Sequence, residues 1–99
     1  MAKLIVSPQD ELDAAAIVEL LADKAGSEVA ARYLREIDAL FERLSLFPRS
    51  GMRRPSLGRD IRFGVVEPYV IIYRYKAGTV TVARIVDGRR NITRRLVRE

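Results

Sequence analysis

The clearest pattern in the chain is a helical repeat of apolar residues across positions 29–47. These residues recur every three or four positions and charged residues fill the opposite side, which predicts an amphipathic helix. A weaker repeat across positions 12–21 follows Ser7-Pro8, a pair typical of a helix start. Because only Ala25-Gly26 separates the two repeats, we expect two helices that fold back on each other as an αα-hairpin.

The second half of the chain has the composition of β-strands. Segments 61–67, 69–76 and 79–86 are rich in β-branched and aromatic residues. Pro68 breaks the first pair of segments, and Ala77-Gly78 is a two-residue hairpin signal between the second pair. Such short connections predict a three-stranded antiparallel meander.

Two further segments complete the predicted architecture. Lys3–Val6 reads as a short N-terminal strand, and residues 48–60 read as a loop because proline and glycine punctuate them. The predicted fold class is α+β, with both helices on one face of the sheet. We expect residues 1–99 to form a single domain that ends in a basic tail over residues 89–99.

The predicted strands carry aliphatic residues on both faces, although a sheet with one solvated face normally alternates apolar and polar positions. One helical hairpin can cover only one face. The face left open is expected to carry Val70, Ile72, Val80 and Val82 beside Arg62, Arg74 and Arg84. An exposed patch of this kind usually marks a binding surface, here for a segment that is both apolar and acidic. The alternative is that the tail, from Ile92 to Val97, folds back over this face.

Charge is distributed unevenly along the chain. Residues 1–47 hold nine acidic and five basic side chains, whereas residues 48–99 hold thirteen basic and four acidic ones. Fifteen of the eighteen cations are arginine, whose planar donor fork suits carboxylates and phosphates. The basic half is therefore the half expected to meet an anionic partner.

The residue types that are missing limit the chemistry. The chain has no cysteine and no histidine, so it lacks disulfides, thiolate metal sites and the commonest general acid/base. No acidic cluster has the spacing of metal ligands. We therefore expect no metal, no cofactor and no catalytic residues.

No apolar run approaches the roughly 20 residues that a membrane-spanning helix needs. The N-terminus has too short an apolar stretch for a signal peptide. The expected location is the cytoplasm, without a membrane partner.

The order of elements and several short motifs resemble the RelE/ParE toxin family of type II toxin–antitoxin systems. The motifs are Phe47-Pro48-Arg49-Ser50-Gly51, Arg54-Pro55-Ser56-Leu57-Gly58, Ile61-Arg62-Phe63, Pro68-Tyr69-Val70-Ile71-Ile72-Tyr73-Arg74 and Val82-Ala83-Arg84-Ile85-Val86-Asp87-Gly88-Arg89-Arg90. The loop and the strand that starts at Pro68 look closer to the ParE branch than to the RelE branch.

The resemblance implies a toxin held inactive by a cognate, ParD-like antitoxin whose acidic, flexible segment folds on the toxin. It also implies DNA gyrase as the target of the free toxin, which would act without catalytic residues. In this reading Arg62, Arg74 and Arg84 bind the antitoxin. The candidate contacts with gyrase lie in the basic tail and are Arg89, Arg90, Arg94, Arg95 and Arg98.

Two other functions remain open from the sequence. The RelE branch cleaves mRNA on the ribosome, which requires proton transfer. The chain has no tyrosine after Tyr75, and Asp87 stands where many members have histidine, so only Glu67 and Asp87 remain as candidate bases. A plain nucleic-acid-binding domain is the third possibility. No basic recognition helix supports it, and we expect no direct sequence-specific DNA binding.

Overall fold

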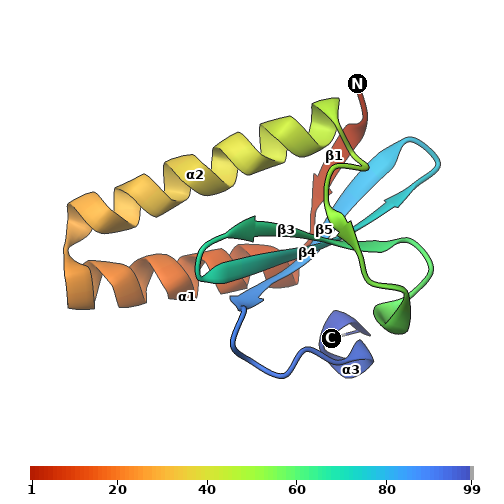
Figure 1. Ribbon diagram of the computed structural model, residues 1–99. Coiled ribbons are helices and arrows are strands. Elements are labelled where there is room, and N and C mark those ends of the chain that lie inside the picture. The colour runs from red at the N-terminus through yellow and green to blue at the C-terminus, as the bar shows by residue number, and fades with distance from the viewer. Residues whose placement is uncertain (99) are drawn as a thin grey trace.

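The computed structural model describes the backbone of residues 1–98 and the side chains of residues 1–97. Its elements, in chain order, are β1 (Lys3–Val6), α1 (Pro8–Ala25), α2 (Ser27–Leu46), β2 (Met52–Arg53), the 3-10 helix η1 (Pro55–Leu57), β3 (Ile61–Val66), β4 (Tyr69–Lys76), β5 (Thr79–Asp87) and α3 (Arg94–Arg98). The five strands form one sheet in the order β1-β5-β4-β3-β2 (Figure 1). β1 pairs with β5 in parallel, and the other neighbours are antiparallel.

The α+β fold class predicted from the sequence is confirmed, with two additions. The segment predicted as a loop contains the short strand β2 and the turn η1. The hairpin between β4 and β5 turns at Ala77 and Gly78, whose φ angles are 52° and 77°. Two successive positive φ angles define the turn type that matches the twist of paired strands, so this prediction is also confirmed.

Local signals explain where the two long helices begin. The Ser7 hydroxyl accepts a hydrogen bond from the Asp10 N–H at 3.0 Å, and Pro8 occupies the first turn of α1, as the sequence predicts. Gly26 joins α1 to α2 with a φ of 95°. Gly26 also occupies the capping position of α2, and Ser27 is the first residue inside the helix, so no side-chain hydrogen bond caps α2 in the described chain.

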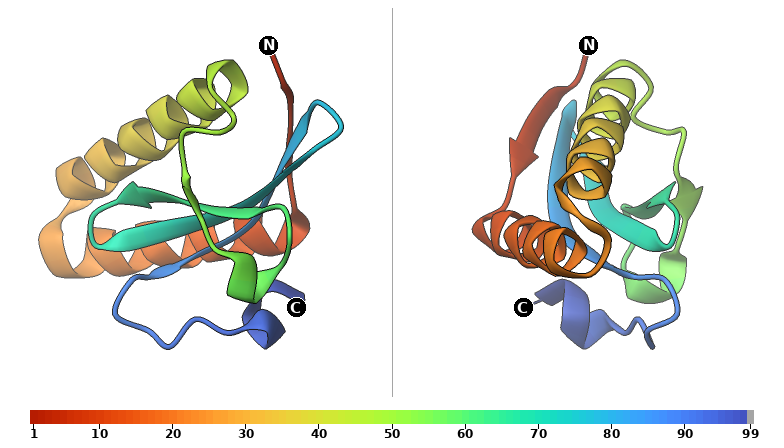
Figure 2. Two further views of the ribbon diagram at one scale, coloured as in Figure 1. Left: turned by 45° about the vertical axis from the view of Figure 1, so that its right-hand side comes forward. Right: turned by 90° about the vertical axis from the view of Figure 1, so that its left-hand side faces the viewer.

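Both long helices cover the same face of the sheet (Figure 2). From α2, Ile37, Leu40 and Leu44 are buried against the sheet, and Leu44 is fully buried. Ile17 and Leu21 of α1 pack against the same cluster. A side chain of this size contributes about 1.5–3 kcal/mol when fully buried, so this layer forms the main core.

The buried side of α1 also contains carboxylates. Leu12 and Leu20, which were expected on its apolar stripe, are 65% and 48% exposed. Asp10 is only 1% exposed, and its Oδ1 atom has no hydrogen-bond partner among the described residues. Burial, together with the nearby charges of Asp13 and Glu11, raises the pKa of Asp10 to about 7.

We expect Asp10 to make the stability of the protein depend on pH. Its folded-state pKa lies above the unfolded value, so the folded protein holds an extra proton between about pH 4 and 7. The bound proton therefore contributes to the free energy of unfolding at low pH, and this contribution is lost as pH rises through this range. Relative to the native chain, Asp10→Asn should gain roughly 2–4 kcal/mol between pH 4 and 7, measured by urea unfolding. Asp23→Asn, an exposed change on the same helix, is the control, and a pH-independent difference for Asp10→Asn would contradict the prediction.

Candidate partner-binding site

A β-bulge decides which side chains of β5 reach the open face of the sheet. Ile72 pairs with Arg84 whereas the next residue, Tyr73, pairs with Val82, so Ala83 is an extra residue in β5. The extra residue reverses the alternation of the strand. Val80 and Val82 therefore point toward the helices and are fully buried, and the prediction that they share an open face with Arg84 is wrong.

Arg62 also lies away from the open face. It stands opposite the core residue Tyr73, and its Nη1 donates to the carbonyls of Arg49 and Gly51 at 3.0 and 2.9 Å. The Tyr73 hydroxyl accepts from the Gly51 N–H at 2.9 Å and donates to the Pro48 carbonyl at 2.8 Å. Arg62 and Tyr73 thus hold the segment that follows α2. The predicted grouping of Arg62 with Val70 is wrong.

The C-terminal tail covers part of the open face. Ile72 is fully buried there in a second cluster, together with Ile61, Val86 and Leu96 of α3. The expectation that Ile72 is an exposed binding residue is therefore wrong, and the alternative of a tail folded onto the sheet holds for this part of the face. Val65 at the other end of the face is still 50% exposed.

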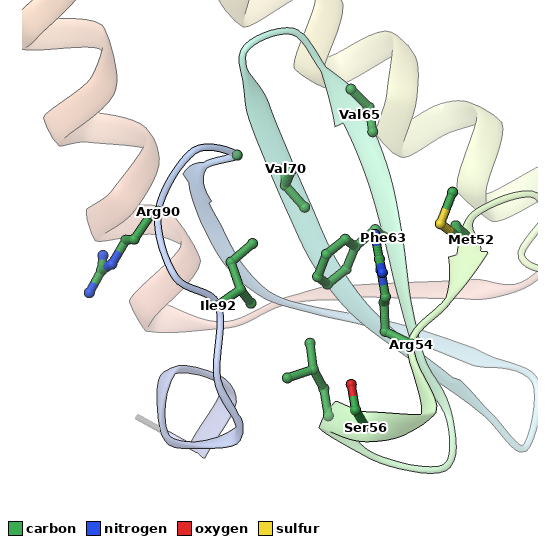
Figure 3. Close-up of a pocket in the computed structure, with 10 residues that line it drawn as sticks. Met52, Arg54, Ser56, Phe63, Val65, Val70, Arg90 and Ile92 are labelled. Carbon is green, nitrogen blue, oxygen red and sulfur yellow. The ribbon is translucent and has the colours of Figure 1, made fainter.

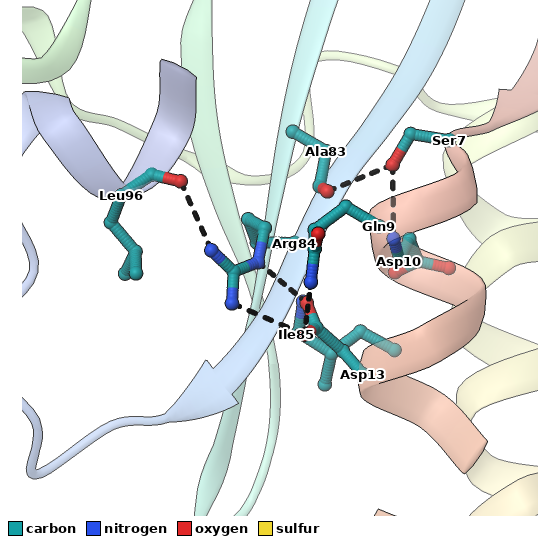
Figure 4. A network of polar contacts seen from close by, with 8 residues as sticks. All are labelled: Ser7, Gln9, Asp10, Asp13, Ala83, Arg84, Ile85 and Leu96. Carbon is teal, nitrogen blue, oxygen red and sulfur yellow. Dashed lines mark hydrogen bonds and ion pairs between the residues drawn. The ribbon is translucent and has the colours of Figure 1, made fainter. Parts of the chain in front are cut away.

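The buried side chain of Arg84 holds the C-terminal tail against the sheet (Figure 4). Its Nε and Nη2 atoms donate to Asp13 at 2.7 and 3.1 Å, and its Nη1 donates to the Leu96 carbonyl at 3.3 Å. Asp13 also accepts from the Ile85 N–H at 3.0 Å. The side chains of Arg84 and Asp13 are only 10% and 11% exposed, so Arg84 is not the surface contact that the sequence suggested.

What remains open is a groove of about 320 Å³ between the sheet, η1 and the tail (Figure 3). Phe63 and Val70 lie in it, Leu57 and Ile92 flank it, and Arg54 stacks on the Phe63 ring at 4.8 Å. The other residues along the groove are Met52, Ser56, Val65, Gly88 and Arg90. It is thus lined by apolar side chains and two arginines, and by no carboxylate.

Another hollow adjoins this groove and shares Leu57 with it. Arg74 and Arg94 line it together with Leu57, Gly58 and Val97. The Nε atom of Arg94 donates to the Ser56 carbonyl at 3.0 Å, which fixes the start of α3 against η1. Of the predicted antitoxin-binding residues, Val70 and Arg74 are the two that the structure places at this surface.

The tail arginines, which were predicted as target contacts, lie in different surroundings. Arg90 lines the groove and Arg94 the adjoining hollow. Arg89 is exposed and forms an ion pair of 2.6 Å with Asp87. Arg95 is exposed, and the side chain of Arg98 lies outside the described residues.

Sequence reasoning missed Asp13 and most of the groove. Asp13 lies four residues before Ile17 and eight before Leu21, so a carboxylate on the buried stripe of α1 was a signal that it has a buried partner. The groove residues Met52, Arg54 and Leu57 gave no such signal, because they lie in a segment without periodicity.

The comparisons with known proteins identify the family. The model described as "ParE toxin of type II toxin-antitoxin system, parDE" matches residues 4–92. The chain belongs to the ParE toxin family. It is 39% identical to Toxin ParE3 of Caulobacter vibrioides over 71 residues, which are 72% of this chain and 71% of that protein. The resemblance noted from the sequence is thereby confirmed.

A solved structure shares the fold of this ParE-family toxin. The chain titled "Chromosomal ParDE TA system from P. aeruginosa" superposes with a TM-score of 0.75 at 24% identity, over 88% of this chain and 96% of that one. No helix in the described part of this toxin is long and apolar enough to span a membrane. Its described residues also contain no group of three or more potential metal-binding side chains.

We expect the Asp13–Arg84 pair to be essential to the stability of this ParE-family toxin. Asp13→Ala removes the partner charge of a buried guanidinium and the acceptor of the Ile85 N–H, and should cost about 3 kcal/mol or more in urea unfolding. Asp13→Asn keeps an oxygen for the Ile85 N–H and should lose less. Asp38→Ala, which removes an exposed carboxylate on α2, should be nearly neutral. Equal, small losses for Asp13→Ala and Asp38→Ala would show that the pair is dispensable.

Proposed function

We propose that this ParE-family toxin is neutralised by a ParD-like antitoxin whose acidic, partly apolar segment docks in the groove lined by Phe63 and Val70. The groove itself carries the proposal, because it presents apolar side chains with Arg54 and Arg90 and without a carboxylate. Apolar anchors supply affinity in such interfaces, and complementary charge supplies specificity and association rate. Arg74 and Arg94 extend the cationic surface in the adjoining hollow.

We further propose that the free toxin inhibits DNA gyrase by binding rather than by catalysis. The available proton-transfer groups support this choice over the RelE-type ribonuclease. The side-chain hydrogen bond from Arg89 lowers the pKa of Asp87 well below its usual range, which makes Asp87 a weak base. Burial raises the pKa of Tyr69 and of Tyr73, which disfavours their anionic forms. Glu67 is exposed in the turn between β3 and β4, outside the groove.

Substitutions in the groove test where the antitoxin docks. Val65→Asp and Arg90→Glu change exposed residues, so the fold should persist, and each should weaken antitoxin binding about tenfold or more in calorimetric titration. Leu20→Asp makes a matched change on the exposed side of α1 and should leave the affinity unchanged. If Leu20→Asp weakens binding and Val65→Asp does not, the antitoxin docks on the helical layer and the proposed site is wrong.

Expression of the toxin without its antitoxin tests the target. Gyrase inhibition predicts induction of the DNA-damage response with cleaved chromosomal DNA, whereas the ribonuclease alternative predicts immediate translation arrest with cut mRNA. The Asp87→Asn variant separates the two further, because a catalytic base would be lost and a binding inhibitor would keep its toxicity. Translation arrest that disappears in Asp87→Asn would overturn the gyrase proposal.

A further inference from the structure

A second hollow lies at the other end of the sheet, beside the hairpin that connects β4 and β5. It has a volume of about 440 Å³ and shares no lining residue with the groove described above. Five cations line it: Arg49, Arg53, Arg59, Arg62 and Lys76. Asp60 is its one carboxylate, so the hollow carries a local excess of four positive charges.

The strand pairing and the turns between strands bring these cations together from segments that are separate in the sequence. Arg53 of β2 stands directly opposite Arg62 of β3. The Tyr75 N–H donates to the Asp60 carbonyl at 3.1 Å, which places the turn before β3 beside the end of β4 and thus Arg59 near Lys76. Arg49 reaches the same place from the segment after α2, where its guanidinium stacks on the Tyr75 ring at 5.1 Å.

Arg62 holds the segment that follows α2, but the charge of the group as a whole is not neutralised by ion pairs. None of the five forms an ion pair with a carboxylate of the described residues. Arg53, Arg59 and Lys76 are exposed, and their side chains make no hydrogen bond within the described chain. Like charges directly opposite each other across two strands destabilise a sheet, as Arg53 and Arg62 do here. A ligand that brings negative charge would offset this cost.

We propose that this hollow binds the phosphodiester backbone of a nucleic acid without regard to base sequence. Arginine forks and a lysine head are the groups that proteins use for phosphate, and the Arg49–Tyr75 stack offers a flat surface for a base or sugar. An acidic peptide fits less well, because the cores of protein interfaces are apolar and depleted of charge. The exposed apolar anchors that such a peptide needs, such as Met52 and Val65, lie in the groove and not here.

Backbone binding of this kind has a measurable signature in its dependence on salt. Each neutralised phosphate contributes about −0.9 to the slope of log affinity against log salt on duplex DNA. Three to five contacts therefore predict that affinity for a 20-base-pair duplex falls by roughly 40- to 500-fold between 50 and 200 mM NaCl. Duplexes of unrelated sequence should bind equally well in fluorescence anisotropy.

The variant Arg53→Ala/Arg59→Ala/Lys76→Ala tests the site in the full-length toxin. It should lose at least about tenfold in DNA affinity at 50 mM NaCl, and its salt slope should become shallower by about 2–3. The matched control Lys24→Ala/Arg32→Ala/Arg35→Ala removes the same charge from exposed positions near the turn between α1 and α2, at the far end of the molecule (Figure 1). The control should keep the affinity and slope of the native chain.

Three results would overturn the proposal. One is equal losses in the two triple variants, which would mean that only net charge matters. Another is the absence of salt-dependent binding by the native chain. The last is tighter binding of poly-glutamate than of DNA, which would assign the hollow to an acidic protein segment. The melting temperature checks the fold, and it should not fall in the Arg53 triple variant, because the Arg53–Arg62 repulsion is removed.

Discussion

The arrangement of this molecule depends on the carboxylate of Asp13, which accepts a hydrogen bond from the edge of β5. β1 pairs only with Thr79 to Val82, the first part of β5, and leaves the rest of that edge without a neighbouring strand. There the start of α1 takes over, because the Ser7 hydroxyl donates to the Ala83 carbonyl at 2.9 Å and Asp13 accepts from the Ile85 N–H. An edge with unpaired backbone groups invites association with other chains, so a helix that satisfies them also protects the sheet.

The same carboxylate determines how the tail lies on the sheet. Arg84 is buried beside Asp13 and extends to the Leu96 carbonyl, so one ion pair connects α1, β5 and α3. Burying two charges is costly unless they are paired and further hydrogen-bonded, and here Asp13 accepts from a backbone N–H as well. The position of α3 in turn sets the limit of the groove at Ile92. A contact within the fold thus defines the surface that is left for a partner.

Much of the fold could be predicted because its strongest signals are local. The periodicity of α2, the cap at Ser7 and the Ala77-Gly78 turn each depend on a few neighbouring residues. The bulge at Ala83 could not be predicted in this way, because both faces of this strand carry apolar residues and either register would bury some of them. Because of this one extra residue, Val80 and Val82 lie on the opposite face of the sheet from Arg84. The binding surface that was predicted to contain all three residues is therefore not formed.

The uneven charge of the chain has a structural meaning that the sequence alone did not provide. The acidic half forms β1 and the two long helices, and the basic half forms most of the sheet and the tail. In the basic half, Arg84 and Arg89 form ion pairs with carboxylates, and most of the other cations face solvent or line a hollow. They gather at two places that share no lining residue, one rich in apolar side chains and one lined mainly by charged ones. Because apolar area favours a folded peptide segment and dense cationic charge favours phosphate, the two places suit different ligands, and a protein segment that fills the groove can leave the basic hollow accessible.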